Sequence, residues 1–159
     1  MTVLASKTYV DALVVASSFD IIAASAKAFS HVNFNTTTIT NGVMHNVYRA
    51  SSAAQNDEVV FLLPQPLKAG TWTLVLTYLA NTSFGIYTVS TSADAVTWTD
   101  RGTVDSYGAA SVLFNRTEIT GLTIPAGQLY VRLKMATKNG SSSGYLGRLT
   151  GVAGTRTGA

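Results

Sequence analysis

The feature that most constrains the fold is the run from Ala69 to Ala80, in which apolar and polar side chains alternate. With a period of two residues, Trp72, Leu74, Leu76 and Tyr78 project to one face, and threonines occupy much of the other. Pro64 and Pro66 precede the run, Gly70 lies at its start and an Asn-Thr-Ser sequence follows it, so both ends carry turn residues. We therefore expect a central β-strand whose inner face carries a tryptophan and a tyrosine.

Other segments of the chain show the same strand-and-turn pattern. Residues 128–136 alternate cleanly, and the dipeptide Asn41-Gly42 predicts a hairpin turn. The run Val59–Leu63 is apolar at every position, so it belongs between two packed layers or against another subunit. Roughly eight to ten short strands with closely spaced turns are typical of a sandwich or jelly roll. The expected fold is all-β, an antiparallel β-sandwich of jelly-roll type.

The length of 159 residues fits one domain. We expect residues 31–152 to form the jelly-roll sandwich and residues 153–159 to form a polar C-terminal tail that is mobile unless docked. Residues 1–30 are expected to form an N-terminal arm or first strands. Their apolar spacing fits a helix as well as strands, but clustered β-branched residues favour extended structure. Pairing of this arm with a neighbouring subunit is a hypothesis.

Composition narrows the function classes. The charged fraction is 12%, against about 25% in ordinary soluble domains, which favours a protein that works inside an assembly. The net charge of +3 arises from few acids, and the basic residues are dispersed, so no nucleic-acid partner is expected. No apolar run reaches the roughly 18–20 residues that span a membrane, so no membrane partner is expected. The absence of cysteine excludes disulfides and thiolate metal sites.

No constellation of residues indicates catalysis. His31 and His45, the only histidines, lack the spacing of a metal site, and the eight acidic residues are scattered. We therefore expect no enzyme activity, no catalytic residue, no metal and no cofactor. The sequence around Asp94 resembles a short hairpin in which the aspartate caps backbone N–H groups, although Ala95 stands where glycine is usual.

The best candidate contact surface is the outer face of the segment 128–136. Tyr130, Arg132 and Lys134 oppose a strongly apolar face there, and an aromatic ring beside two bases can bind an acidic partner or a glycan. A solvated outer face explains these residues equally well. Trp72 and Trp98 could stack on a sugar ring, but their register with apolar neighbours predicts that both belong to the core.

A series of short segments in the second half of the chain carries a resemblance. The segments are Ala69–Leu74, Gly85–Ser90, Thr97–Thr99, Gly102–Tyr107, Leu133–Asn139 and Ser141–Tyr145. Together they resemble jelly-roll modules of tailed-bacteriophage virion proteins, which include capsid decoration (cement) proteins, head fibres and tail-associated proteins. The likeness covers about residues 69–150, and the rest of the chain adds only a compatible β pattern.

The resemblance implies a non-enzymatic structural protein of the virion. Our first expectation is a capsid decoration protein on the capsid surface, a homotrimer that binds the major capsid protein and stabilises the shell. The alternative is a carbohydrate-binding or receptor-binding module of a phage tail protein, with surface glycans as partners. A hydrolase domain is a weaker third option, because it needs paired carboxylates in a cleft.

Overall fold

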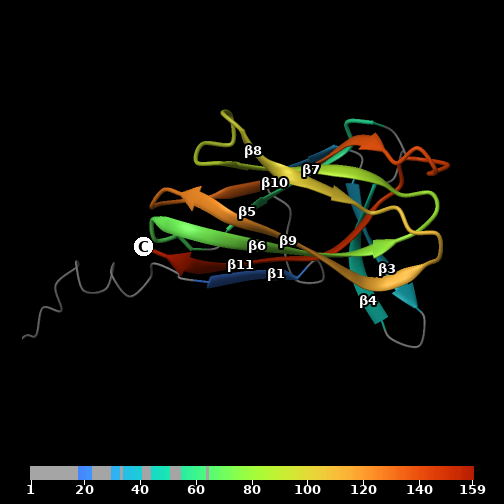
Figure 1. The fold of residues 1–159 in the computed structure, drawn as a ribbon, viewed down its shortest axis with the longest axis horizontal. Helices are drawn as coiled ribbons and strands as arrows, with labels where there is room; N and C mark the ends of the chain where they lie inside the picture. Colours follow the sequence, from blue (N-terminus) through green and yellow to red (C-terminus); the bar gives the residue numbers. More distant parts are fainter. Residues whose placement is uncertain (1–17, 23–29, 33, 41–43, 51–54, 64) are drawn as a thin grey trace, which may run out of the picture.

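A computed structural model describes residues 18–22, 30–32, 34–40, 44–50, 55–63 and 65–159. The described chain forms eleven β-strands in two antiparallel sheets that pack face to face (Figure 1). The strands are β1 (Ser18–Ile22), β2 (Ser30–Val32), β3 (Phe34–Thr40), β4 (Met44–Ala50), β5 (Glu58–Leu62), β6 (Gly70–Ala80), β7 (Gly85–Ser92), β8 (Thr99–Asp105), β9 (Val112–Ile124), β10 (Tyr130–Lys138) and β11 (Arg148–Gly158). The expected antiparallel jelly-roll sandwich is confirmed.

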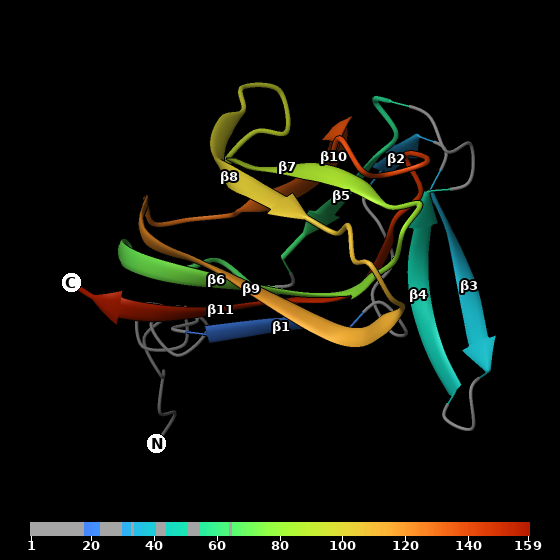
Figure 2. The same ribbon diagram turned by 45° about the vertical axis from the view of Figure 1, so that its right-hand side comes forward.

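The six-stranded sheet has the order β3-β4-β11-β6-β9, and β1 also pairs with β11. The five-stranded sheet has the order β2-β5-β10-β7-β8. Figure 2 shows the β3–β4 hairpin extending beyond one end of the two packed layers. Its strands pair from Phe34↔Ala50 to Thr40↔Met44, as the Asn41-Gly42 prediction requires, while the turn itself lies outside the described residues.

The run that dominated the sequence pattern becomes β6, which lies between β11 and β9 in the six-stranded sheet. Trp72, Leu74, Leu76 and Tyr78 are all buried, and the threonines between them are half-buried on the other face. The indole Nε1 of Trp72 donates a hydrogen bond to the backbone oxygen of Lys68 at 3.1 Å, so the buried ring leaves no unpaired donor. The prediction of a central strand with an aromatic inner face is confirmed.

Facing strands of the five-stranded sheet supply the other half of the core. Inward side chains from β5, β7 and β10 meet those of β6 between the layers; the largest fully buried ones include Phe61, Tyr87, Leu133 and Met135. The Val59–Leu63 run, expected either between two layers or against another subunit, lies between the two sheets, because Val59, Phe61 and Leu63 point into this core. On the opposite face Leu62 is exposed, whereas Val60 is also buried.

The two ends of the chain depart from the expected domain limits. Residues after Val152 do not form a tail but continue β11, which pairs with β6 as far as Gly158↔Thr71. At the N-terminal end, β1 pairs with β11 of the same chain, from Ser18↔Thr155 to Ile22↔Gly151. Most of the expected N-terminal arm, including residues 1–17 and 23–29, lies outside the described residues. Backbone pairing thus extends the sandwich beyond the segment that alternation alone identified.

Candidate functional site

The outer face of β10 carries the three residues singled out as a contact surface. Because β10 lies between β5 and β7, Tyr130, Arg132 and Lys134 occupy the centre of the five-stranded sheet. All three are half-buried, and the residues between them point into the core. Cross-strand pairing places Tyr130 between Leu62 and Ser92 on this face. The predicted orientation is therefore correct, and we call this surface the β10 face.

Trp98 joins the β10 face, which the sequence did not predict. It lies just before β8 and is half-buried rather than part of the core. The guanidinium carbon of Arg132 lies 4.4 Å from the centre of the Trp98 ring, within the range of a cation–π contact. The expectation that both tryptophans belong to the core holds for Trp72 and is wrong for Trp98. The reason is the turn before Trp98, where Val96 is 80% exposed and strand alternation no longer applies.

The β7–β8 connection that presents Trp98 is fixed by side-chain hydrogen bonds. One carboxylate oxygen of Asp94 accepts hydrogen bonds from the backbone N–H groups of Val96 and Thr97 at 2.9 and 2.8 Å, and from the hydroxyl of Ser92 at 2.8 Å. The N–H of Thr97 is the largest of the causes that lower the pKa of Asp94 to about 2. Ala95 adopts a φ of 60°, which explains why glycine is usual there. The predicted capping role of Asp94 is confirmed.

Polar groups surround the two aromatic rings of the β10 face. The Ser90 hydroxyl donates to a carboxylate oxygen of Asp100 at 2.7 Å and accepts from Nη2 of Arg132 at 3.3 Å. Within the described part of the chain, the side chain of Lys134 makes no hydrogen bond or ion pair. Ser90 itself is buried. The face therefore combines two half-buried rings with a carboxylate and two cationic groups, a mixture typical of sites for small polar ligands.

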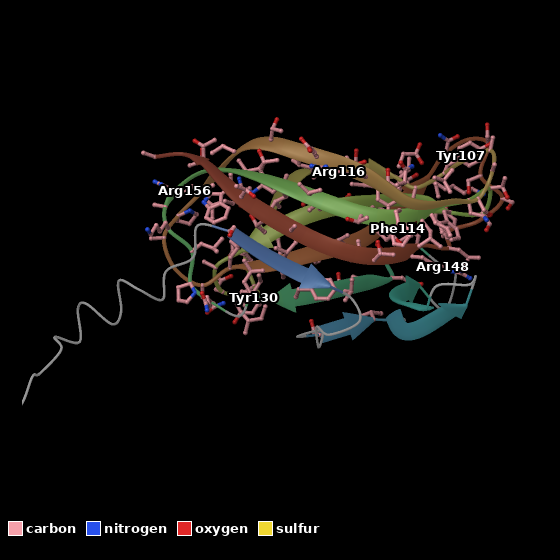
Figure 3. The ribbon with its side chains drawn as sticks, turned by 90° about the horizontal axis from the view of Figure 1, so that it is seen from below. Tyr107, Phe114, Arg116, Tyr130, Arg148 and Arg156 are labelled. Carbon is pink, nitrogen blue, oxygen red and sulfur yellow. The ribbon has the colours of Figure 1, made fainter. Side chains whose placement is uncertain are left out.

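A second concentration of aromatic and charged groups lies at the opposite end of the sandwich. Figure 3 places Tyr107, Phe114 and Arg148 near one end and Tyr130 near the other. A hollow of about 180 Å³ at the Arg148 end is lined mainly by the β6–β7, β8–β9 and β10–β11 connections and the residues beside them; its lining includes Asn81, Phe84, Leu113 and Arg148. The guanidinium carbon of Arg148 lies 5.9 Å from the centre of the Phe84 ring. No sequence pattern joined these residues, because they come from connections distant in the chain.

Neither a metal-binding group nor a membrane-spanning helix occurs among the described residues. No group of three or more His, Asp or Glu residues that could hold a metal ion occurs among the residues that the structure describes. His31 and His45 fall in β2 and β4, and their side chains lie outside the described ones. The described ranges contain no helix long and apolar enough to cross a membrane. The expectation of no cofactor stays a prediction.

Comparison with known proteins gives matches among solved structures. No protein-family model and no curated protein matches the chain. A family 35 carbohydrate-binding module from an environmental isolate has a TM-score of 0.61 at 15% identity, covering 88% of this chain and 94% of its own. A family 6 module from Cellvibrio mixtus lichenase 5A, in complex with cellotriose, has a TM-score of 0.58 at 10% identity over 87% of this chain and 97% of its own. The chain has the fold of carbohydrate-binding modules.

A much larger enzyme also contains this fold. Paenibacillus xanthan lyase matches with a TM-score of 0.67 at 23% identity over 87% of this chain. The matched part is only 13% of the lyase chain, so this chain spans a small part of that enzyme's length. The reported structures thus include modules that bind carbohydrate and an enzyme that carries such a fold as one part.

These comparisons overturn the resemblance to bacteriophage virion proteins. The similar structures are carbohydrate-binding modules and an enzyme, and none of those reported is a virion protein. The prediction of a capsid decoration protein is therefore wrong, and neither the major capsid protein as partner nor the homotrimer has support. The physical reason is that the six short segments are strands and turns that any jelly roll requires. The capsid-surface location depended on the same resemblance, and no observation tests it.

Proposed function

We propose that the chain is a non-catalytic carbohydrate-binding domain whose β10 face binds a neutral oligosaccharide. The observation that carries the proposal is Trp98, held half-buried over Arg132 on the same outer face as Tyr130. Two rigid rings beside fixed polar groups suit a sugar, whose C–H faces pack on aromatic rings while its hydroxyls form hydrogen bonds. The shared fold of carbohydrate-binding modules supports the same conclusion.

The polar groups of the face match the hydroxyls of a sugar. A hydroxyl both donates and accepts, so Asp100 can accept from it while Arg132 or Lys134 donates to it. Ser90 already links Asp100 to Arg132, which holds these two groups in fixed positions before a ligand arrives. Such preorganisation reduces the entropy lost on binding.

The known complexes supply the first ligands to test. The matched structures include modules in complex with cellotriose, with cellobiose, and with xylotriose together with calcium. We therefore expect cellotriose or xylotriose to bind this chain as well. The described residues contain no group of three or more His, Asp or Glu side chains that could hold a metal ion. Titrations with calcium and with a chelator test whether a metal nevertheless contributes to binding.

The experiment is isothermal titration calorimetry with cellotriose and xylotriose. Replacing Trp98 or Tyr130 by alanine is expected to weaken binding by about tenfold or more, a loss of about 1.4 kcal/mol. The matched control is Tyr107→Ala, which removes a half-buried ring at the opposite end (Figure 3) and is expected to leave binding unchanged. Binding that is lost in Tyr107→Ala and kept in Tyr130→Ala would overturn the assignment to the β10 face. Cleavage of the ligand during the titration would overturn the non-catalytic role.

A further inference from the structure

A second cavity lies beside the β7–β8 connection. It has a volume of about 290 Å³, and its lining includes Thr91, Ser92, Asp94, Arg101, Pro125 and Leu129. Figure 1 shows the β7–β8 connection and the β9–β10 turn at the same end of the sandwich, where β11 also ends. We call this space the hairpin cavity. Trp98, Tyr130, Arg132 and Lys134 do not line it, and it adjoins the β10 face only at Ser92, which pairs with Tyr130.

Arg101 supplies the charge of the hairpin cavity. Its Nε donates a hydrogen bond to the Thr91 hydroxyl at 2.7 Å, which fixes the direction of the guanidinium. Within the described chain its two Nη atoms make no hydrogen bond and no ion pair. Partial burial lowers the pKa of Arg101, because the charged form is less well solvated there. A planar fork of unused donors fits the oxygens of an anionic group.

Asp94 lines the same cavity but does not neutralise Arg101. No ion pair joins these two residues, although both are described. The Oδ1 atom of Asp94 is occupied by the Ser92 hydroxyl and by the N–H groups of Val96 and Thr97. One carboxylate oxygen of Asp94 is therefore engaged within the connection itself, and no ion pair reaches the guanidinium of Arg101 among the described residues.

The remaining walls limit the size and shape of a ligand. Pro125 and Leu129 provide an apolar side, and Thr99 contributes a hydroxyl. Ligand sites typically measure about 300–1,000 Å³, and the cavity, at about 290 Å³, lies just below that range. One small ring with polar substituents fits these conditions better than an extended chain.

We propose that the hairpin cavity binds one acidic sugar residue, with its carboxylate or sulfate group on the free Nη atoms of Arg101 and its ring against Pro125 and Leu129. The site goes beyond the proposed function, since the β10 face takes a neutral oligosaccharide on a different set of aromatic and charged residues. The two sites require different ligands and different residues. One can therefore fail without the other.

The test follows backbone amide signals by nuclear magnetic resonance while glucuronate, glucose 6-sulfate, glucose or acetate is added. Either acidic sugar is expected to shift the signals of Thr99 and Arg101. The acidic sugar that binds more tightly identifies the preferred anionic group. Glucose is expected to leave these signals unchanged. Equal affinity for glucose, or an affinity for acetate as high as for the acidic sugars, would overturn the proposal. Shifts confined to Tyr130 and Lys134 would overturn the location.

Four variants separate the site from general effects on the fold. Arg101→Gln is expected to weaken binding of the acidic sugar about tenfold or more, and Arg101→Lys is expected to weaken it as well, because a lysine keeps the charge but loses the fork. Asp94→Asn keeps a capping oxygen and removes a negative charge that repels the anionic sugar. The affinity for the acidic sugar is therefore expected to rise about twofold. Tyr130→Ala is expected to bind the acidic sugar normally. Unchanged affinity in both Arg101 variants, each shown to be folded by its amide spectrum, would contradict the proposal.

Discussion

Two tryptophans with similar sequence surroundings have different roles at the residue scale. Trp72 is 0% exposed and hydrogen-bonded, whereas Trp98 covers the guanidinium of Arg132 at the surface. We expect Trp72→Ala to lower the free energy of unfolding by about 3–5 kcal/mol, as for other large-to-small changes in a core. Trp98→Ala is expected to cost only about 1 kcal/mol, because a cation–π contact is weak near the surface. Removing Trp98 also gives water access to the buried Nε of Arg132, which has no hydrogen-bond partner in the described chain.

Urea unfolding of both variants measures this difference. Tyr130→Ala serves as the surface control, since it removes a half-buried ring from the same face. Equal losses for the two tryptophans would mean that Trp98 belongs to the core after all.

Asp94 makes the β7–β8 connection sensitive to acid. Its folded-state pKa of about 2 lies below the ordinary value of 3.8, mainly because backbone N–H groups bind the carboxylate. A lowered pKa means that the charged form stabilises the fold above pH of about 4 and that this contribution is lost as the pH falls toward about 2. We expect the amide signals of Val96 and Thr97 to titrate with a midpoint near that lower value. In Asp94→Asn this titration should be absent, and a wild-type midpoint near the ordinary value would show that the capping bonds are not formed in solution.

At the scale of elements, β9 is shaped by two irregularities. Its pairing with β6 shifts register between Trp72 and Leu74 and again between Tyr78 and Ala80. Gly121, at the first shift, has a φ of 70°, and Phe114, at the second, has a φ of 60°. Bulges of this kind bend and twist a strand at the edge of a sheet. Among the described strands, β9 is such an edge, because it pairs only with β6.

Gly121 tests whether backbone conformation alone maintains this bend. A Cβ atom added there meets no atom within 4 Å, so any cost of Gly121→Ala comes from its positive φ. We expect a loss of about 1–2 kcal/mol in the free energy of unfolding, measured in urea. Gly140 is the matched control, because it also has open space around it but no positive φ. Gly140→Ala should change stability by less than about 0.5 kcal/mol, and equal effects at both positions would remove the role assigned to the bulge.

Elements that a two-residue period defines were predictable from the sequence, and contacts between turns were not. Alternation identified β6 and β10 and the outward direction of Tyr130, Arg132 and Lys134. The same rule misplaced Trp98, because it was applied across the Asp94 turn, where the chain leaves strand geometry. Packing of Trp98 on Arg132 depends on how that turn folds back over the sheet. Sequence spacing alone therefore does not predict this contact.

For the whole molecule, a low charged fraction did not identify the partner. Charged residues make up 12% of the chain, and half-buried threonines on β6 illustrate how uncharged polar groups occupy outer positions. A surface of hydroxyls and apolar atoms can be covered by protein subunits or can contact a glycan. The short segments that suggested a virion protein encode strands and turns, which the carbohydrate-binding modules share at low sequence identity. Fold therefore followed from the sequence, whereas function required the arrangement of particular side chains.

Salt dependence should distinguish the two proposed sites on one molecule. Between about 0.01 M and 1 M salt the Debye length falls from about 30 Å to about 3 Å, so attraction between exposed charges is screened. Binding of cellotriose on the β10 face should change less than about twofold over this range, because ring packing and hydrogen bonds do not depend on net charge. Binding of an acidic sugar at Arg101 should weaken several-fold, since the charge of that guanidinium has no partner within the described chain. Calorimetric titrations of both ligands at the two salt concentrations measure this contrast. A neutral ligand that weakened as steeply as the acidic one would mean that Arg132 and Lys134, rather than the rings of Trp98 and Tyr130, dominate recognition on the β10 face.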